Sequence, residues 1–231
     1  MISIEGVNQF YGSTQTLWDL DLEVAEGSIT CIMGRNGVGK TTLLKCLMGL
    51  LPIKSGSLRV GDTDFARLPA VARPRSGVAY VPQGRDVFPL LTVEENLRIG
   101  LGSRRDKIRE IPQQVFELFP VLNDMLSRRG GDLSGGQQQQ LAIGRALVLD
   151  PQVLILDEPN EGIQPNIVRQ IGDVVLKLNK EQGLTVILVE QKLAFARRVG
   201  QEFRLMEKGR VVASGNMDLL SDELVNRHLA V

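Results

Sequence analysis

The chain has 231 residues, more than one average domain, yet it contains no low-complexity or Ser/Pro-rich stretch that would separate two domains. Acidic and basic residues are balanced at 27 each and aromatic residues are few, which argues against a cationic surface built for nucleic acid. No run approaches the roughly 18 apolar residues of a membrane-spanning helix, and the first residues do not have the pattern of a secretion signal. We therefore expect one compact body that stays in the cytoplasm and does not bind nucleic acid.

The first part of the chain has the pattern of short strands. Residues 2–24 alternate apolar and polar side chains, which predicts antiparallel β-structure. Residues 29–33 are an apolar strand pattern that leads into a glycine-rich loop over 34–42 and then a helical pattern over 43–50. Further short strands are expected between 56 and 82.

The rest of the chain is mainly helical in pattern, with two short apolar runs. Residues 93–149 carry helical periodicity and are interpreted as a helical insertion. Residues 153–156 and 185–189 are continuously apolar, as in buried parallel strands, and an amphipathic helix is expected between them over 165–180. The order of elements predicts an α/β fold with a parallel sheet in its core.

The glycine-rich loop has the spacing of a phosphate-binding loop, Gly34-x-x-x-x-Gly39-Lys40-Thr41, between a strand and a helix. Glycines allow successive backbone N–H groups to turn inward around phosphate oxygens, where a side chain would obstruct them. We expect Lys40 to reach the β- and γ-phosphates of a nucleotide and Thr41 to bind Mg²⁺. The predicted phosphate-binding residues are Gly34, Arg35, Asn36, Gly37, Val38, Gly39, Lys40, Thr41 and Thr42.

Two carboxylates, Asp157 and Glu158, follow the apolar run 153–156. Because ligands bind at the carboxyl edge of the strands in α/β sheets, these side chains are expected to lie on the same edge as the glycine-rich loop. Asp157 is predicted to act at the Mg²⁺ site. Glu158 is suited to orient and deprotonate a water that attacks the γ-phosphate. A solvated acidic turn is the simpler alternative.

A second anion site is predicted where a helical pattern begins near residue 138. The unpaired N–H groups and the dipole of a helix N-terminus attract phosphate. Since the chain already has one phosphate loop, a second site makes sense if it faces the nucleotide of a partner chain, although a linker turn would have a similar sequence. The residues concerned are Ser134, Gly135, Gly136 and Gln137.

In combination these motifs resemble the ABC ATPase family. The family markers occur in order: the phosphate loop at 34–42, Gln83, the segment 133–137 and the pair Asp157-Glu158. The resemblance implies a P-loop NTPase (RecA-like) core with a mixed sheet, an N-terminal antiparallel β subdomain and an inserted α-helical subdomain. In this chain the single domain would divide into a core of residues 1–83 and 150–231 and a helical subdomain of residues 84–149.

The resemblance also implies the working assembly. Two cassettes would pair head to tail, so that each ATP, with its Mg²⁺, lies between one chain's phosphate loop and the other chain's segment 133–137. Tyr11 would stack on adenine, and Gln83 would bind Mg²⁺ and sense the γ-phosphate. The partners would be a second ABC ATPase subunit, equal or different, and membrane-spanning permease subunits, with a solute-binding protein acting indirectly. The location would be the cytoplasmic face of the cell membrane.

Two positions depart from the usual family pattern. Gln191 stands where the family usually has a switch histidine, and the one histidine, His228, lies too near the C-terminus to replace it. A glutamine can donate a hydrogen bond to a γ-phosphate oxygen but cannot take up a proton at neutral pH, so hydrolysis is expected to depend more on Glu158. Gln164 stands in place of the aspartate that usually contacts the partner cassette.

These departures, with the segment Glu161-Gly162-Ile163-Gln164-Pro165, resemble the second ATPase subunit of urea and branched-chain amino acid importers. We predict an ATPase that powers urea import, with branched-chain amino acid import as the alternative. A soluble ABC ATPase that moves no solute is a further alternative, and a P-loop kinase would leave segment 133–137 unexplained. Arg85 and Phe88 are candidate contacts for the permease.

Overall fold

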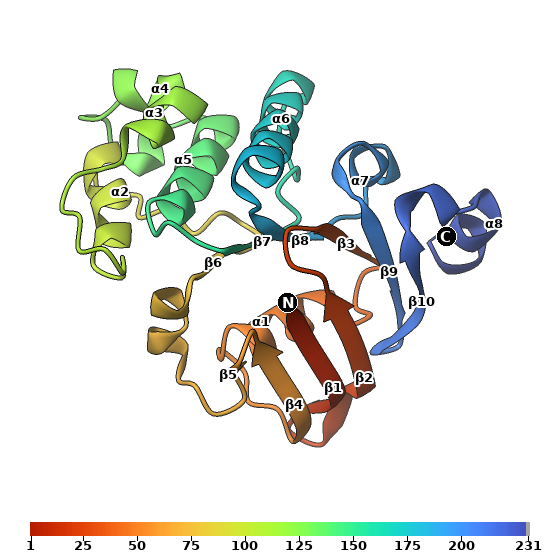
Figure 1. Ribbon diagram of the computed structural model, residues 1–231. Coiled ribbons are helices and arrows are strands. Elements are labelled where there is room, and N and C mark those ends of the chain that lie inside the picture. Colours follow the sequence, from red (N-terminus) through yellow and green to blue (C-terminus); the bar gives the residue numbers. More distant parts are fainter. Residues whose placement is uncertain (230–231) are drawn as a thin grey trace.

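The structure, a computed structural model, describes residues 1–229 and contains two β-sheets with helices around them (Figure 1). Within these residues the larger sheet has the strand order β10-β9-β3-β8-β7-β6. Its neighbours pair in parallel except for the antiparallel hairpin of β9 and β10, so the sheet is mixed. The strands are β3 (Ile29–Met33), β6 (Val78–Val81), β7 (Val153–Asp157), β8 (Thr185–Val189), β9 (Glu202–Glu207) and β10 (Arg210–Asn216).

The central strands of this sheet are buried on both faces. Every residue of β3, β7 and β8 is buried, which explains their continuously apolar sequences. Alternate residues of β7 point to opposite faces: Leu154 joins one hydrophobic cluster and Ile155 the other. Helices α6 (Pro165–Gln182) and α7 (Leu193–Val199) cover one face, and α1 (Lys40–Leu47) lies on the other (Figure 1).

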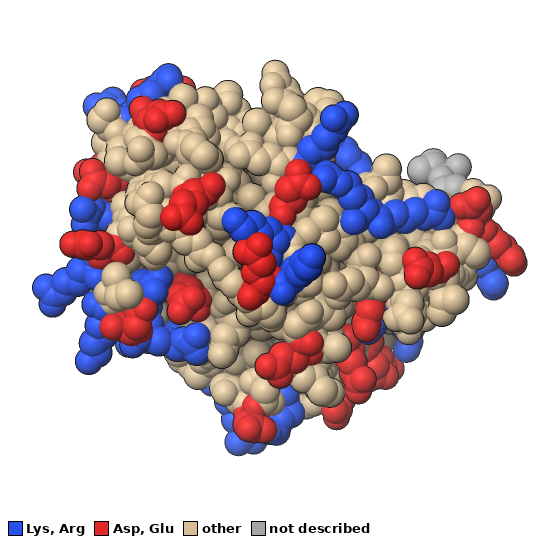
Figure 2. Space-filling model, turned by 45° about the horizontal axis from the view of Figure 1, so that its top comes forward, with Lys and Arg blue, Asp and Glu red and all other residues tan. Residues whose placement is uncertain are grey.

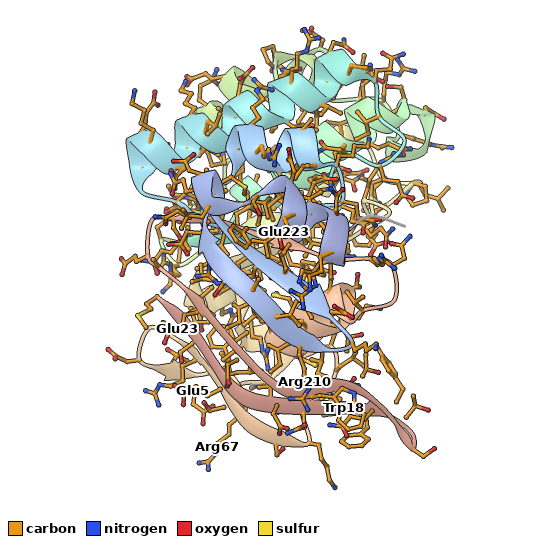
Figure 3. The ribbon with its side chains drawn as sticks, turned by 90° about the vertical axis from the view of Figure 1, so that its right-hand side faces the viewer. Glu5, Trp18, Glu23, Arg67, Arg210 and Glu223 are labelled. Carbon is orange, nitrogen blue, oxygen red and sulfur yellow. The ribbon has the colours of Figure 1, made fainter. Side chains whose placement is uncertain are left out.

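The smaller sheet is antiparallel and contains the N-terminal strands. Its order is β2-β1-β4-β5, and its strands are β1 (Ile2–Tyr11), β2 (Thr14–Val24), β4 (Ser55–Val60) and β5 (Thr63–Asp64). It is joined to the β9–β10 turn: Trp18 N donates to Gly209 O at 3.0 Å, and an Asp19 carboxylate oxygen lies 3.6 Å from Arg210 Nη2. Figure 3 shows Trp18 and Arg210 close together at this end of the molecule. The predicted antiparallel β subdomain is confirmed.

Helix α1 is fixed at its C-terminal end by a buried arginine. The last carbonyl groups of a helix have no partner within the helix. In α1 the buried Arg73 is that partner: its guanidinium donates to Cys46 O at 2.8 Å and to Leu47 O. The same guanidinium also donates to Phe65 O at 2.5 Å. This contact holds the helix that follows the glycine-rich loop against the segment before β6.

The predicted helical insertion lies between β6 and β7. Its helices are α2 (Val93–Leu101), α3 (Gln113–Leu118), α4 (Pro120–Asp124) and α5 (Gly135–Leu147). Helix α2 begins with a capping box in which Thr92 Oγ1 accepts from Glu95 N at 3.1 Å, and the Glu95 carboxylate accepts from Thr92 N at 2.7 Å. We propose that residues 84–149 form the helical subdomain and that residues 1–83 with 150–231 form the core, of which residues 230 and 231 lie outside the described part of the chain.

Several elements differ from the sequence prediction. Helix α1 begins three residues earlier than expected, at Lys40, and α5 begins within the glycine segment, at Gly135. Strands β9 and β10 and helix α8 (Asp222–His228) were not predicted. No helix in residues 1–229 has both the length and the apolar character needed to cross a membrane.

Candidate functional site

The glycine-rich loop wraps around the side chain of its own lysine. Lys40 is buried, and its Nζ donates to Gly34 O at 2.7 Å and to Arg35 O at 2.9 Å. Gly37 and Gly39 have φ angles of 79° and 107°, which other residues rarely adopt. Burial lowers the pKa of Lys40, and the negative charge of Glu158 opposes this shift. The loop therefore presents a positive charge and a backbone conformation that suit the binding of an anionic group.

Asp157 ends β7 beside the start of α1. It is 1% exposed and accepts a hydrogen bond from Tyr80 Oη at 3.3 Å. Burial raises its pKa, and hydrogen bonds from Thr41 and Tyr80 oppose this shift. Its Oδ1 is buried without a hydrogen-bond partner. Buried polar atoms are rarely left unpaired, and Mg²⁺ binds oxygen ligands. The Asp157 carboxylate, with one oxygen left without a close partner, lies beside Thr41, which lines the phosphate-loop pocket together with Gln83, and this set of oxygen donors fits such a cation.

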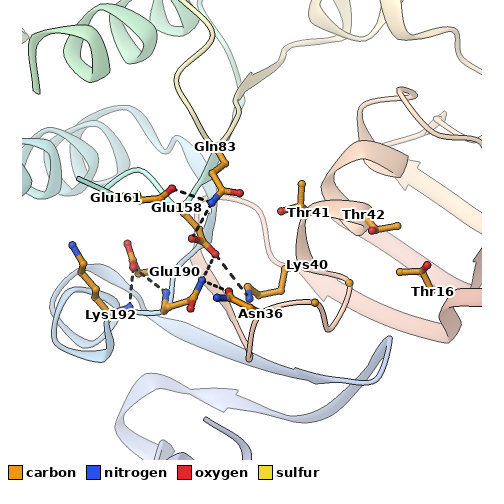
Figure 4. Close-up of a pocket in the computed structure, with 13 residues that line it drawn as sticks. Thr16, Asn36, Lys40, Thr41, Thr42, Gln83, Glu158, Glu161, Glu190 and Lys192 are labelled. Carbon is orange, nitrogen blue, oxygen red and sulfur yellow. Dashed lines mark hydrogen bonds and ion pairs between the residues drawn. The ribbon is translucent and has the colours of Figure 1, made fainter. Parts of the chain in front are cut away.

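Glu158 lies at the centre of a set of polar contacts (Figure 4). Its φ of 48° is in the left-handed region, an unusual conformation for a residue with a side chain and one that occurs at functional sites. Lys40 Nζ lies 4.0 Å from its Oε1, which also accepts a hydrogen bond from Gln191 Nε2. Gln191 Nε2 in turn donates to Asn36 Oδ1 at 2.7 Å. The glutamine thus connects the phosphate loop to Glu158.

Buried Glu190 ties together the loops that follow β7 and β8. Its carboxylate accepts hydrogen bonds from the backbone N–H of Gln191 at 2.9 Å and of Lys192 at 2.8 Å, and from Asn160 Nδ2 at 2.7 Å. Lys192 Nζ donates back to Asn160 O at 2.8 Å. Burial raises the pKa of Glu190. The sequence analysis did not predict this network, which holds Gln191 and the turn after Glu158 in fixed positions.

Gln83 approaches the site from the loop after β6. Its Nε2 donates to Glu161 Oε2 at 2.9 Å and lies 3.5 Å from Glu158 Oε2. Gln83 and Glu161 line the same cavity as Lys40, Thr41 and Glu158, with a volume of about 630 Å³. The structure therefore brings together the predicted residues of the phosphate loop, Gln83, Glu158 and Gln191, and it adds Glu161, which the sequence analysis missed.

Tyr11 lies beside the phosphate loop but outside this cavity. Its ring is 46% exposed, and its Oη is 3.4 Å from Thr42 Oγ1. Thr16, from the neighbouring strand, lines the cavity instead. An exposed ring next to the loop is compatible with base stacking, so the adenine contact stays a prediction.

The segment that was predicted to face a partner lies in a separate cavity, also of about 630 Å³. Ser134 begins α5 with a capping box: its Oγ accepts from Gln137 N at 3.4 Å, and Gln137 Oε1 accepts from Ser134 N at 2.9 Å. Gly135, Gly136 and Gln164 line this second cavity. It shares no lining residue with the first cavity, so the segment does not face the chain's own phosphate loop.

The comparisons with known proteins agree with this geometry. Residues 17–161 match the family model described as "ABC transporter". The chain is 42% identical over 213 residues to a "High-affinity branched-chain amino acid transport ATP-binding protein BraG" of Pseudomonas aeruginosa, covering 92% of this chain and 91% of that protein. It is 36% identical over 221 residues to a "Probable branched-chain amino acid transport ATP-binding protein LivF" of Archaeoglobus fulgidus, covering 95% and 94%.

Among solved structures, a dimeric post-hydrolysis state of an ATP-binding cassette bound to ADP and Pi superposes with a TM-score of 0.84 and 26% identity, covering 94% of this chain and 99% of that one. A nucleotide-free cassette from an ABC transporter superposes with a TM-score of 0.82 and 26% identity, covering 100% and 95%. The predicted P-loop NTPase fold is thereby confirmed. The chain belongs to the ABC transporter family and is an ATPase of that family.

Proposed function

We propose that this chain hydrolyses ATP to drive the import of branched-chain amino acids through separate membrane-spanning subunits. The observation that carries the proposal is the pair of relatives described above, whose names specify branched-chain amino acid transport and which match more than nine tenths of this chain. The sequence analysis favoured urea and held branched-chain amino acids as the alternative. The relatives support the alternative, and nothing in the geometry of the site favours urea.

In the proposed reaction the phosphate loop and Lys40 bind the β- and γ-phosphates of ATP. Thr41, Gln83 and Asp157 would hold Mg²⁺, which supplies positive charge against the charge that develops on the transferred phosphoryl group. Glu158 accepts a proton from the attacking water. Gln191 donates a hydrogen bond to Glu158 and would donate to a γ-phosphate oxygen of bound ATP.

Ser134 and its neighbours would complete the nucleotide site of a second cassette. The N-terminus of α5 offers unpaired N–H groups and a positive dipole end to a phosphate. A dimeric cassette bound to ADP and Pi, of the same fold as this chain, supports an assembly of this kind. The second cassette can be a copy of this chain or a related subunit.

The contact with the permease is proposed to involve apolar side chains of the helical insertion. Phe88, Leu90 and Ile99 are 45%, 78% and 46% exposed. Arg85, the other candidate, is engaged inside the chain: its guanidinium donates to Glu161 O at 3.0 Å. On the face shown in Figure 2, acidic and basic side chains are mixed on the left, acidic ones group at the lower right, and basic ones run along the upper right.

Uptake by cells that lack this chain tests the transported solute. We expect deletion to abolish high-affinity uptake of labelled leucine and to leave urea uptake unchanged, and we expect the wild-type gene to restore leucine uptake. Loss of urea uptake with normal leucine uptake would reverse the assignment. Normal uptake of both would favour an ATPase that moves neither solute.

A further inference from the structure

Gln83 carries its amide between two carboxylates. Its Nε2 lies 2.9 Å from Glu161 Oε2 and 3.5 Å from Glu158 Oε2. A carboxylate only accepts hydrogen bonds, and of the two ends of a glutamine amide only the NH₂ group donates. The two carboxylates therefore determine which end of the amide faces them.

This orientation leaves the amide oxygen of Gln83 for another partner. Figure 4 shows the oxygen on the side of the cavity where Thr41 lies, with the nitrogen turned toward Glu158 and Glu161. A hard cation such as Mg²⁺ binds the oxygen and not the NH₂ group. Two of the three side chains proposed as metal ligands, Thr41 and Gln83, thus present oxygen atoms to the same space.

Of the two carboxylates, Glu161 is the one free to hold Gln83. Glu158 is already engaged, since it accepts from Gln191 and lies 4.0 Å from Lys40. For the Glu161 carboxylate, Gln83 is the hydrogen-bond donor found among the described residues, and the contact is the shorter one. When ATP and water draw Glu158 into the reaction, Glu161 can keep its hydrogen bond to Gln83.

The backbone of Glu161 is held from the same loop that carries Gln83. Arg85 Nη2 donates to Glu161 O at 3.0 Å, and Glu161 N donates to Glu158 O at 3.3 Å across a tight turn. The next residue, Gly162, has a φ of 63°, which lets the chain turn away. Glu161 therefore accepts hydrogen bonds from two residues of one loop. Gln83 donates to its carboxylate, and Arg85 donates to its carbonyl group.

We propose that Glu161 is a positioning residue that orients Gln83 for the nucleotide-bound metal ion. The proposal rests on the ATPase function proposed above and adds a residue to the metal site. Glu161 acts through Gln83 and does not touch the metal or the nucleotide. The carboxylate serves as the hydrogen-bond acceptor for Nε2, so a neutral acceptor of the same shape can replace it.

Binding of Mn²⁺ in the presence of adenylyl imidodiphosphate, a non-hydrolysable ATP analogue, tests this role in the full chain. Bound Mn²⁺ loses the electron paramagnetic resonance signal of the free ion, so metal affinity is read without turnover. We expect Glu161→Ala to weaken Mn²⁺ binding by roughly three- to tenfold, as for loss of one partly exposed hydrogen bond to a charged group. Glu161→Gln keeps an acceptor and should stay within about twofold of wild type.

A double-mutant cycle with Gln83→Ala separates positioning from a direct effect of charge. In the Gln83→Ala background, Glu161→Ala should cause no further loss, because the residue it orients is gone. Glu117→Ala, which removes an exposed acid of α3, is the matched control and should bind Mn²⁺ as wild type does. Binding of the analogue without metal should not change in any of these variants.

Three results would overturn the proposal: unchanged Mn²⁺ affinity in Glu161→Ala, an equal loss with and without Gln83, or a loss in Glu161→Gln as large as in Glu161→Ala. The last would mean that the negative charge, and not the accepted hydrogen bond, is what matters. A different result, in which the wild-type chain binds neither the analogue nor Mn²⁺, would refute the proposed ATPase chemistry itself.

Discussion

The phosphate-loop cavity and the cavity at the tip of α5 have similar volumes, about 630 Å³ each, but differ in how their side chains are held. In the phosphate-loop cavity, Glu158, Gln191 and Lys40 contact one another and are tied to neighbouring loops. In the second cavity, Ser134 and Gln137 pair with each other at the tip of α5, and Gln140 Nε2 donates to Gln170 Oε1 at 2.8 Å. The difference fits the proposal that one chain preorganises the chemistry and that the tip of α5 completes the nucleotide site of another cassette.

The boundary between the cavities is a single turn. Glu161 lines the first cavity and Gly162 lines the second. Arg85 spans the same boundary, because it donates to Glu161 O and lies near the tip, with Nη1 3.4 Å from Gln138 Oε1. The phosphate-loop cavity and the tip of α5, which is proposed to face a partner, are thus in physical contact through this turn.

Substitution of the proposed base should abolish the function of the phosphate-loop cavity and leave the cavity at the tip of α5 unaffected. Glu158→Gln keeps the size of the side chain but cannot accept a proton, so we expect turnover to fall by about 10²- to 10⁴-fold while ATP binding is retained. Phosphate release and binding of a fluorescent ATP analogue measure the two properties separately. Rapid hydrolysis by this variant would remove Glu158 from the role of base.

A bulky side chain at the tip of α5 should abolish the function of the second cavity and leave the phosphate-loop cavity unaffected. Ser134→Arg removes the cap of α5 and places a long side chain where a partner's phosphates would lie, so we expect about a 10²-fold loss of hydrolysis, within the range seen when one preorganised anion contact is lost. Binding of ATP to the separate chain should be unchanged, because Ser134 lies outside the phosphate-loop cavity. Normal turnover in Ser134→Arg would contradict the partner role.

Substitution of Gln191 tests how much its two hydrogen bonds, to Asn36 and Glu158, contribute to the preorganised site. Gln191→Ala loses the hydrogen bonds to Asn36 and Glu158, and we expect turnover to fall by about 10- to 100-fold, as for loss of a hydrogen bond to a charged group. Because an amide does not titrate, the variant and the wild type should have parallel rate profiles between about pH 6 and 8. Diverging profiles would show that residue 191 affects a titrating group.

Arg85→Ala is expected to have the smallest effect, because it changes the link between the cavities and neither cavity itself. The loss of the hydrogen bond to Glu161 O should reduce turnover by roughly three- to tenfold and leave ATP binding to the separate chain unchanged. Arg85→Lys keeps the charge but not the two-pronged geometry, so it serves as the matched variant. Equal rates for all three proteins would show that the link has no role in turnover.

Much of the fold and of the first cavity could be predicted because their signals are local. The phosphate loop lies in one short segment, and Asp157 and Glu158 directly follow an apolar strand. The hairpin of β9 and β10 was missed, because Lys208-Gly209 is not one of the usual hairpin turn pairs and the alternation on both sides is imperfect.

The missed site residues depend on contacts between distant parts of the chain. Glu161 meets Gln83 across a separation of 78 residues, and Asn160 meets Glu190 across 30. A lone glutamate or asparagine in a turn looks like solvated surface, and only the folded loops show which donor it faces. The position of Glu190 directly before Gln191, at the end of a buried strand, was a local signal that could have identified it.

Mixing two inactive variants tests the central claim most directly, namely that the phosphate loop of one chain and the α5 tip of another form a single site. A mixed dimer of Glu158→Gln and Ser134→Arg contains one intact composite site, made by Glu158 of one chain and Ser134 of the other. We expect the equimolar mixture to recover up to about a quarter of the wild-type rate, since half of the dimers would be mixed and each would have one working site of two. A mixture as inactive as either variant alone would contradict a composite site in a dimer of this chain.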